Sequence, residues 1–185
     1  MQNMADAQHP NGAMPTTAPE YVVFEGPGMD AFAESPEWGG SLVIFPFMYY
    51  ETYGDDSLIK KYYQHMRRYT DYLKTRADNG ILSFGLGDWY DYGDFRAGFS
   101  RNTPVPLVAT AHYYMTVMYL IKAARMVGNE FDVRYYSSLA YDIMVAFNKR
   151  FLDSNTAQYG TGSQASNALP IFLQMIQSTG DKGDY

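Results

Sequence analysis

The sequence contains no cysteine, and this absence removes several kinds of site at once. Disulfides, thiolate metal ligands and cysteine nucleophiles are excluded, while the redox compartment stays open. Histidine is almost as scarce: His9, His65 and His112 lie far apart and lack the spacing of a zinc-binding helix. We therefore expect no metal site.

Charge is also sparse and has the wrong sign for nucleic acid. Charged residues make up 18% of the chain, and 20 acidic against 14 basic residues leave a net charge of −6. Binding to nucleic acid requires clustered Lys and Arg, so we expect no such partner and favour a neutral, polar ligand. Residues 1–12 do not resemble a secretory signal, and no apolar run approaches the roughly 20 residues of a membrane helix.

Hydrophobic residues, at 46% of the chain, instead follow a helical period. Residues 41–53 are almost uniformly apolar, which predicts a helix buried on most sides, and Gly54 would stop it. Residues 57–76 form an amphipathic pattern. The pair is repeated by apolar residues 106–127 and amphipathic residues 131–151, and residues 163–177 begin a third copy. The sequence therefore predicts an all-α fold of about five helices.

The junctions between these helices indicate an internal repeat. Segments 53–63, 127–136 and 179–185 each contain a glycine followed by an acidic or amide cap. Such a repeat is typical of helical hairpins, in which a buried helix turns tightly into an amphipathic one. The third copy stops where its second helix would begin. We therefore expect residues 1–185 to form one incomplete α/α-barrel domain, truncated at both ends.

The connections differ sharply in length. Each amphipathic helix leads to the next buried helix through a long segment, at residues 9–40, 78–105 and 152–162, whereas the hairpin turns are short. Antiparallel packing places all the long segments at one end, where binding and catalysis concentrate. An α-solenoid or a simple bundle also repeats helical hairpins, but long loops rich in Gly, Trp, Tyr and Asp favour a closed barrel.

Both tryptophans of the chain fall in these long segments, and each follows an acid. The pairs are Glu37–Trp38 and Asp88–Trp89. An aromatic ring stacks on the C–H face of a sugar, and a carboxylate accepts hydrogen bonds from its hydroxyls. The alternative is that each tryptophan covers the core and each acid bonds its own turn. Because the pairs recur in successive repeats, we predict that all four residues bind substrate.

Other polar residues are weaker candidates. Asp91 and Asp94 could join Asp88 in a carboxylate cluster, but the segment lacks the glycine and terminal Glu of a calcium loop. Gln164 is a possible ligand contact at a loop-to-helix entry. Glu37 and Asp88 could be proposed as an acid and base pair, but nothing in the sequence predicts a raised pKa for either. We therefore interpret them as binding residues.

Several segments together resemble the catalytic domain of bacterial α-L-rhamnosidases, a glycoside hydrolase family with a six-hairpin, (α/α)6 barrel. The segments are MADAQHPNGAMPTTAP, SPEWGGSLVIFPFMYYETYGD, GLGDWYDYG and YGTGSQASNALPI. The resemblance runs through most of the chain. It implies inverting hydrolysis of terminal α-L-rhamnosyl groups on a rhamnose-containing oligosaccharide or glycoside, with no cofactor, and it favours a periplasmic or secreted parent protein.

The resemblance also implies roles for individual residues. Trp38 and Trp89 would line the rhamnose pocket, whereas the general acid and the general base, both Glu in the family, would lie upstream of Met1 and downstream of Tyr185. No catalytic residue is then expected in this chain, which would be inactive alone. The sequence departs from the family at Glu37, where Asp is more frequent, and at Gly40, where Ala is frequent.

Two other classes of function stay open at this point. One is another α/α-barrel carbohydrate enzyme, such as a glucosidase or a polysaccharide lyase. The other is a helical carbohydrate-binding module without catalysis. The residues upstream of Met1, read for an acidic catalytic cluster, would distinguish a rhamnosidase from the other barrel enzymes.

Overall fold

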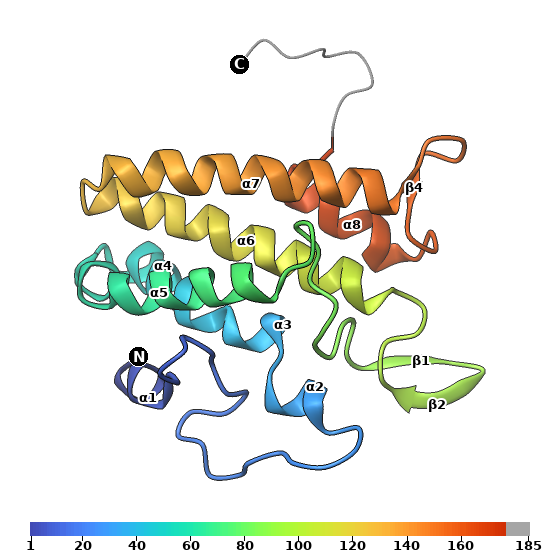
Figure 1. Ribbon diagram of the computed structural model, residues 1–185, viewed down its shortest axis with the longest axis horizontal. Coiled ribbons are helices and arrows are strands. Elements are labelled where there is room, and N and C mark those ends of the chain that lie inside the picture. Colours follow the sequence, from blue (N-terminus) through green and yellow to red (C-terminus); the bar gives the residue numbers. More distant parts are fainter. Residues whose placement is uncertain (177–185) are drawn as a thin grey trace.

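The computed structural model describes residues 1–176, which form an array of packed helices with two small sheets (Figure 1). The helices in chain order are α1 (Gln2–Ala7), α2 (Asp30–Ala33), α3 (Pro36–Gly39), α4 (Ser41–Tyr53), α5 (Ser57–Arg76), α6 (Val105–Met126), α7 (Glu130–Phe151) and α8 (Gln164–Phe172). The antiparallel strand pairs are β1 (Asp91–Gly93) with β2 (Phe95–Gly98) and β3 (Leu152–Asp153) with β4 (Gln158–Tyr159). Within the described range, no helix is both long and apolar enough to span a membrane.

The first hairpin, α4–α5, has the bounds that the sequence predicts. Gly54 ends α4 in the left-handed conformation, at a φ of 69°, which lets the chain reverse direction. The Asp55 carboxylate then accepts a hydrogen bond from the Ser57 backbone N–H at 2.8 Å and satisfies one free donor of α5. The local signals for this turn are therefore sufficient to set it.

The second hairpin is also confirmed, whereas α8 is shorter than predicted. α6 and α7 each begin one residue before the predicted position, and Asn129 caps α7 by accepting from the Asp132 N–H at 3.1 Å. The prediction for residues 163–177 is wrong at its C-terminal end, because α8 stops at Phe172. Gln174 takes a φ of 56°, and a turn follows. The third predicted junction, at residues 179–185, lies outside the described residues.

α6 is the central helix and packs against α3, α4, α5, α7 and α8. Most of its residues are buried, as expected for an inner barrel helix. The amphipathic helices α5 and α7 lie over it and are bonded to each other. Tyr63 Oη donates to Asp132 Oδ2, and Tyr136 Oη donates to Asp71 Oδ1, both at 2.6 Å. The two amphipathic helices are thus joined to each other by a buried and a partly buried hydrogen bond.

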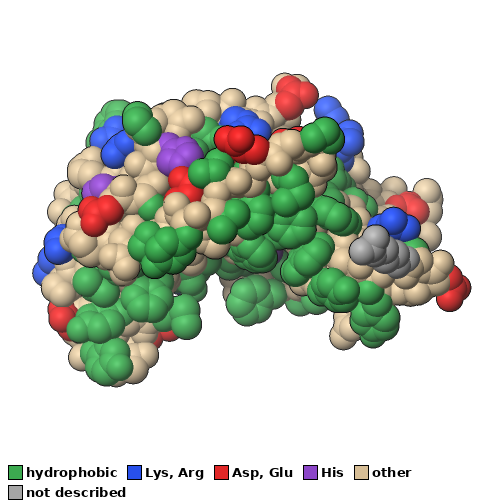
Figure 2. Space-filling view, turned by 90° about the horizontal axis from the view of Figure 1, so that it is seen from below, with side chains coloured by type: hydrophobic (Ala, Val, Ile, Leu, Met, Phe, Trp, Pro, Cys, Tyr) green, Lys and Arg blue, Asp and Glu red, His purple; other side chains and the backbone are tan. Residues whose placement is uncertain are grey.

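The apolar helices α4 and α8 are exposed on one face. Phe45 and Met48 of α4 are 44% and 57% exposed, and Ile171 and Phe172 of α8 are 60% and 77% exposed. The prediction that residues 41–53 are buried on most sides is therefore wrong for this face. Figure 2 shows that the molecule is hollowed on one side, with hydrophobic side chains gathered around the hollow.

The long connections lie toward one end, as the repeat predicts, and we call residues 8–40, 77–104 and 152–163 the loop face. The turns α4–α5 and α6–α7 lie together at the opposite end (Figure 1). These connections contain more regular structure than expected, since they carry α2, α3 and both strand pairs. A rigid helical scaffold therefore presents three structured segments at one end.

Candidate functional site

Trp38 lies on α3, a single helical turn where the sequence analysis expects a loop. Pro36 starts this turn, and its fixed φ suits a first helical position. Gly39 has no room for a side chain, because a Cβ there would collide with the Tyr69 hydroxyl of α5. The turn is thus fixed against α5, while the Trp38 ring remains 39% exposed.

Glu37 joins the two segments that carry the tryptophans. Its Oε1 accepts a hydrogen bond from the Gly87 backbone N–H at 3.2 Å, and its Oε2 accepts one from the Ser35 hydroxyl. The same Ser35 Oγ accepts from the Leu86 backbone N–H at 3.1 Å, and Ser35 is fully buried. We call these contacts the Glu37 clamp. It holds the segment before Asp88 against the segment before Trp38.

Gly85 explains how the two segments approach so closely. Its φ is +119°, and a Cβ at this position would lie 2.6 Å from Glu37 Oε2 and 2.8 Å from Pro36 Cδ. Any side chain would therefore displace the clamp, and an L-residue would also be strained at this φ. Gly85 therefore allows a close approach between the backbone of this segment and the Glu37 side chain.

Trp89 is supported by a group of aromatic rings. Its ring lies edge-on to Phe32 of α2 at 5.4 Å, to Tyr90 at 5.1 Å and to Phe99 at 5.6 Å between centroids. Edge-to-face packing of this kind is favourable and fixes ring orientation. Trp89 nonetheless keeps 37% of its surface exposed. Both tryptophans are therefore held by the protein and accessible to a ligand.

Asp88 lies at the wall of a pocket of about 550 Å³ between the second and third segments of the loop face. Its Oδ2 accepts from Thr103 Oγ1 at 3.2 Å, and Thr103 Oγ1 is in turn 2.7 Å from Ser163 Oγ. Gln164, a weaker candidate from the sequence, lines the same pocket and is exposed. The structure thus brings Asp88 and Gln164 together across 76 positions of sequence.

Asp91 has a structural role within the β1–β2 hairpin. Its carboxylate accepts hydrogen bonds from the backbone N–H groups of Tyr92 (2.9 Å), Arg101 (2.6 Å) and Asn102 (2.6 Å), and from the Asn102 side chain (2.7 Å). These bonds, led by the one from Arg101, lower the pKa of Asp91 below its ordinary value. Asp94 makes none of these contacts and is exposed. Among residues 1–176, no group of three or more possible metal-ligating side chains is assembled.

Three polar residues at the loop face were not identified from the sequence. Ser35 completes the Glu37 clamp, Asn102 completes the Asp91 contacts, and Thr103 connects Asp88 to the third segment. Their partners Leu86, Asp91 and Asp88 are 11 to 51 residues away along the chain, so no local pattern marks these contacts. The only sequence signal would have been their position next to the glycine-rich and proline-containing turns.

The scaffold and the site together define a class of protein. Buried and amphipathic helices alternate in antiparallel hairpins, and exposed tryptophans with adjacent acids lie at one end. This combination defines an α/α-hairpin domain with a candidate ligand site at one end. The family model of the bacterial alpha-L-rhamnosidase 6 hairpin glycosidase domain matches residues 1–184, so the chain belongs to this family.

Individual relatives agree with this assignment. An alpha-L-rhamnosidase of Formosa agariphila is 22% identical over 177 residues, and one of Streptomyces avermitilis is 26% identical over 176 residues. Among solved structures, an alpha-L-rhamnosidase from Dictyoglumus thermophilum superposes with a TM-score of 0.81 at 29% identity over 95% of this chain. The Streptomyces avermitilis alpha-L-rhamnosidase complexed with L-rhamnose has a TM-score of 0.79 at 23% identity, again over 95% of this chain, which supports the fold.

The chain corresponds to a small part of these relatives. It spans 18% of the Formosa agariphila protein and 15% of the Streptomyces avermitilis protein. It covers 19% and 16% of the two solved chains. The match therefore concerns a small part of much longer proteins.

Proposed function

We propose that the protein hydrolyses terminal α-L-rhamnosyl groups, and that this chain supplies part of the pocket that holds the sugar. The Glu37 clamp is the observation that carries the proposal. It joins the Glu37–Trp38 and Asp88–Trp89 pairs at one face, where a single ligand could contact both. The family membership supports rhamnose as the sugar.

The proposed roles follow from the geometry. The exposed surfaces of Trp38 and Trp89 would stack on the C–H faces of the sugar. Asp88 would accept a hydrogen bond from a sugar hydroxyl through Oδ1. This oxygen makes no hydrogen bond within residues 1–176. Glu37 contributes chiefly by positioning residues 85–87, since both of its oxygens accept bonds from the protein.

We infer that the reaction's acid and base come from outside residues 1–185. An inverting glycosidase needs two carboxyl groups about 6.5–9.5 Å apart, one with a raised pKa. The carboxyl pKa values that depart from the ordinary range here, those of Asp55, Asp91 and Asp153, are all lowered by hydrogen bonds, chiefly from backbone N–H groups. Glu37, the acid that joins the two tryptophan segments, is occupied by the clamp.

Hydrolysis of an aryl α-L-rhamnoside by the protein at its full natural length tests the proposal. We expect turnover by the full-length protein and none by residues 1–185 alone. Trp38→Leu and Trp89→Leu should each raise KM about tenfold, because each removes a stacking surface. Phe131→Leu, at an exposed aromatic position on α7, is the control and should leave KM unchanged.

Three outcomes would contradict the proposal. Robust turnover by residues 1–185 alone would place the catalytic carboxyl groups within this chain. Binding of rhamnose by a full-length protein that hydrolyses no rhamnoside would instead indicate a carbohydrate-binding module. Lower stability with unchanged KM in both tryptophan variants would assign these rings to packing.

A further inference from the structure

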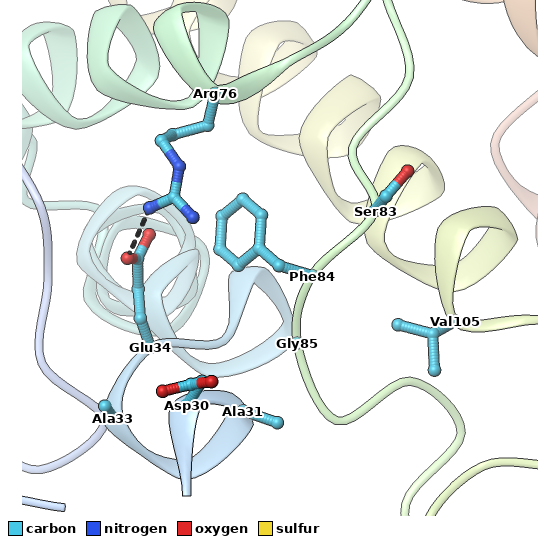
Figure 3. A pocket seen from close by; sticks show the side chains of 9 residues that line it. All are labelled: Asp30, Ala31, Ala33, Glu34, Arg76, Ser83, Phe84, Gly85 and Val105. Carbon is cyan, nitrogen blue, oxygen red and sulfur yellow. Dashed lines mark hydrogen bonds and ion pairs between the residues drawn. The ribbon is translucent and has the colours of Figure 1, made fainter. Parts of the chain in front are cut away.

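A second pocket opens on the loop face beside the candidate site and contains none of its four predicted residues. It has a volume of about 640 Å³ and is lined by α2, the end of α5, residues 83–85 and the start of α6 (Figure 3). The lining residues include Asp30, Glu34, Arg76, Phe84 and Gly85. Small-ligand pockets typically enclose about 300–1,000 Å³. The size therefore suits a ligand of one or two rings.

The wall of this pocket is built around an ion pair. Arg76 Nη1 lies 2.8 Å from Glu34 Oε2, and the same oxygen accepts from Tyr72 Oη at 2.6 Å. Partial burial and the bond to Glu34 raise the pKa of Tyr72 to about 12, so this hydroxyl remains a donor. Arg76 is thus held in place at one edge of its guanidinium group.

Other polar atoms lie at or near the pocket wall. In Figure 3 the second terminal nitrogen of Arg76 points away from Glu34. This nitrogen makes no hydrogen bond within residues 1–176, since both bonds of the guanidinium are through Nη1. Glu34 Oε1 is buried and has no hydrogen-bond partner among the described residues. Asp30 lies below Glu34 and is exposed. A fixed donor, Arg76, and an exposed acceptor, Asp30, therefore border the same space.

The pocket also has an apolar surface and lies next to the candidate sugar site. The Arg76 guanidinium is 4.3 Å from the Phe84 ring centroid, which keeps both groups at the pocket wall. Phe32, between lining residues Ala31 and Ala33, packs edge-on against Trp89 at 5.4 Å. Gly85 lines the pocket and lies so near Glu37 that a Cβ there would be 2.6 Å from Glu37 Oε2. The pocket is thus next to the candidate site on two sides, at α2 and at Gly85.

We propose that this pocket is a second sugar subsite, which holds the residue to which the terminal rhamnosyl group is attached. The inference rests on the proposed function. Two carboxylates against one guanidinium disfavour an anionic ligand, since the acids outnumber the base. A neutral sugar matches the surface, because its hydroxyls would pair with Arg76 and Asp30 and its C–H face would lie against apolar surface.

The test compares two kinds of substrate for the full-length protein. α-L-Rhamnosyl fluoride has a single-atom leaving group, so nothing in this substrate occupies the second pocket. The other substrates are methyl glycosides in which α-L-rhamnose is linked to each position of glucose. Phe84→Leu and Asp30→Asn should lower kcat/KM for the best disaccharide about tenfold more than for the fluoride. Asp30→Asn guards against misfolding, because Asp30 is exposed.

Tyr135→Leu is the matched control. It removes another ring beneath a cation, with Lys74 Nζ 4.8 Å from the Tyr135 centroid, but on the outer surface between α5 and α7. Its ratio of disaccharide to fluoride kcat/KM should equal that of the wild type. Equal losses on both substrates, or no loss in the Phe84 and Asp30 variants, would overturn the subsite. Failure of the wild type to hydrolyse the fluoride would overturn the proposed function itself.

Discussion

Individual buried hydroxyls in this chain differ in whether their hydrogen-bonding capacity is satisfied. Tyr63 Oη donates to Asp132 Oδ2, whose side chain is 2% exposed and also accepts from Asn129. Tyr113 is completely buried, and its hydroxyl has no partner among residues 1–176. Burial raises the pKa of both tyrosines, and the Asp132 bond raises that of Tyr63 further. The same chemical change at the two positions therefore has opposite expected effects.

Removal of the two hydroxyls tests this difference. Tyr63→Phe should lower the free energy of unfolding by about 1.5–3 kcal/mol, because it deprives a buried carboxylate of a donor. Tyr113→Phe should raise it by about 1 kcal/mol, because it removes an unsatisfied buried group. Urea denaturation of the two variants and the wild type measures both values. Equal destabilisation by both substitutions would contradict the assignment.

Residue-level contacts were the least predictable part of the site. The sequence identifies the acid and tryptophan pairs because their composition is unusual. It does not indicate that Glu37 and Ser35 would bond to Leu86 and Gly87, since these partners are about 50 positions away. The prediction that Glu37 binds substrate stays a prediction, and the clamp gives this residue a second role.

At the scale of elements, helices whose ends are set by neighbouring residues were predicted correctly. α4 and α5 have the predicted bounds because Gly54 and Asp55 lie at the turn itself. The end of α8 depends on a distant partner, since Asn148 Nδ2 donates to the Met175 carbonyl at 2.7 Å. Similarly, the β1–β2 hairpin depends on the contacts of Asp91, which connect residues about ten positions apart. Elements fixed by remote contacts were the ones missed.

The β1–β2 hairpin should therefore depend on the charge of Asp91. The pKa of Asp91 is lower in the folded state than its ordinary value of about 3.9, so its stabilisation is present above that pH. It is lost as the pH falls through the folded-state pKa. We expect Asp91→Asn to lower the midpoint of thermal unfolding at neutral pH, and this difference to shrink below about pH 4.

Asp94→Asn is the control for this experiment, since Asp94 is exposed on the same hairpin. It should leave the midpoint near that of the wild type at both pH values. A difference between Asp91→Asn and the wild type that persists unchanged at low pH would show that the charge is not responsible.

At the scale of the whole molecule, the repeat predicted the architecture well. Alternating apolar and amphipathic segments identified the hairpins, and the connection lengths identified the loop face. The sequence could not show which apolar helices lack a neighbour, because periodicity reports a hydrophobic face and not what covers it. α4 and α8 each leave such a face exposed, whereas α6 is enclosed between its neighbours.

These two faces predict the behaviour of residues 1–185 in isolation. Exposed apolar patches promote association, so the sedimentation coefficient should rise with protein concentration. The double variant Phe45→Ser and Phe172→Ser should reduce this dependence. Phe131→Ser with Tyr141→Ser, at exposed positions of α7, is the matched control and should not. A wild-type chain that stays monomeric over the whole concentration range would contradict the prediction.

The Glu37 clamp has a consequence for the entropy of ligand binding. Loops that are free in the absence of ligand lose conformational freedom when they bind, at a cost of about 1–2 kcal/mol for each ordered backbone residue. Here the segments before Trp38 and Asp88 are already bonded to each other through Glu37 and Ser35. Much of that ordering is complete once the chain has folded, so the free energy of contacts with the proposed sugar ligand would appear more fully as affinity.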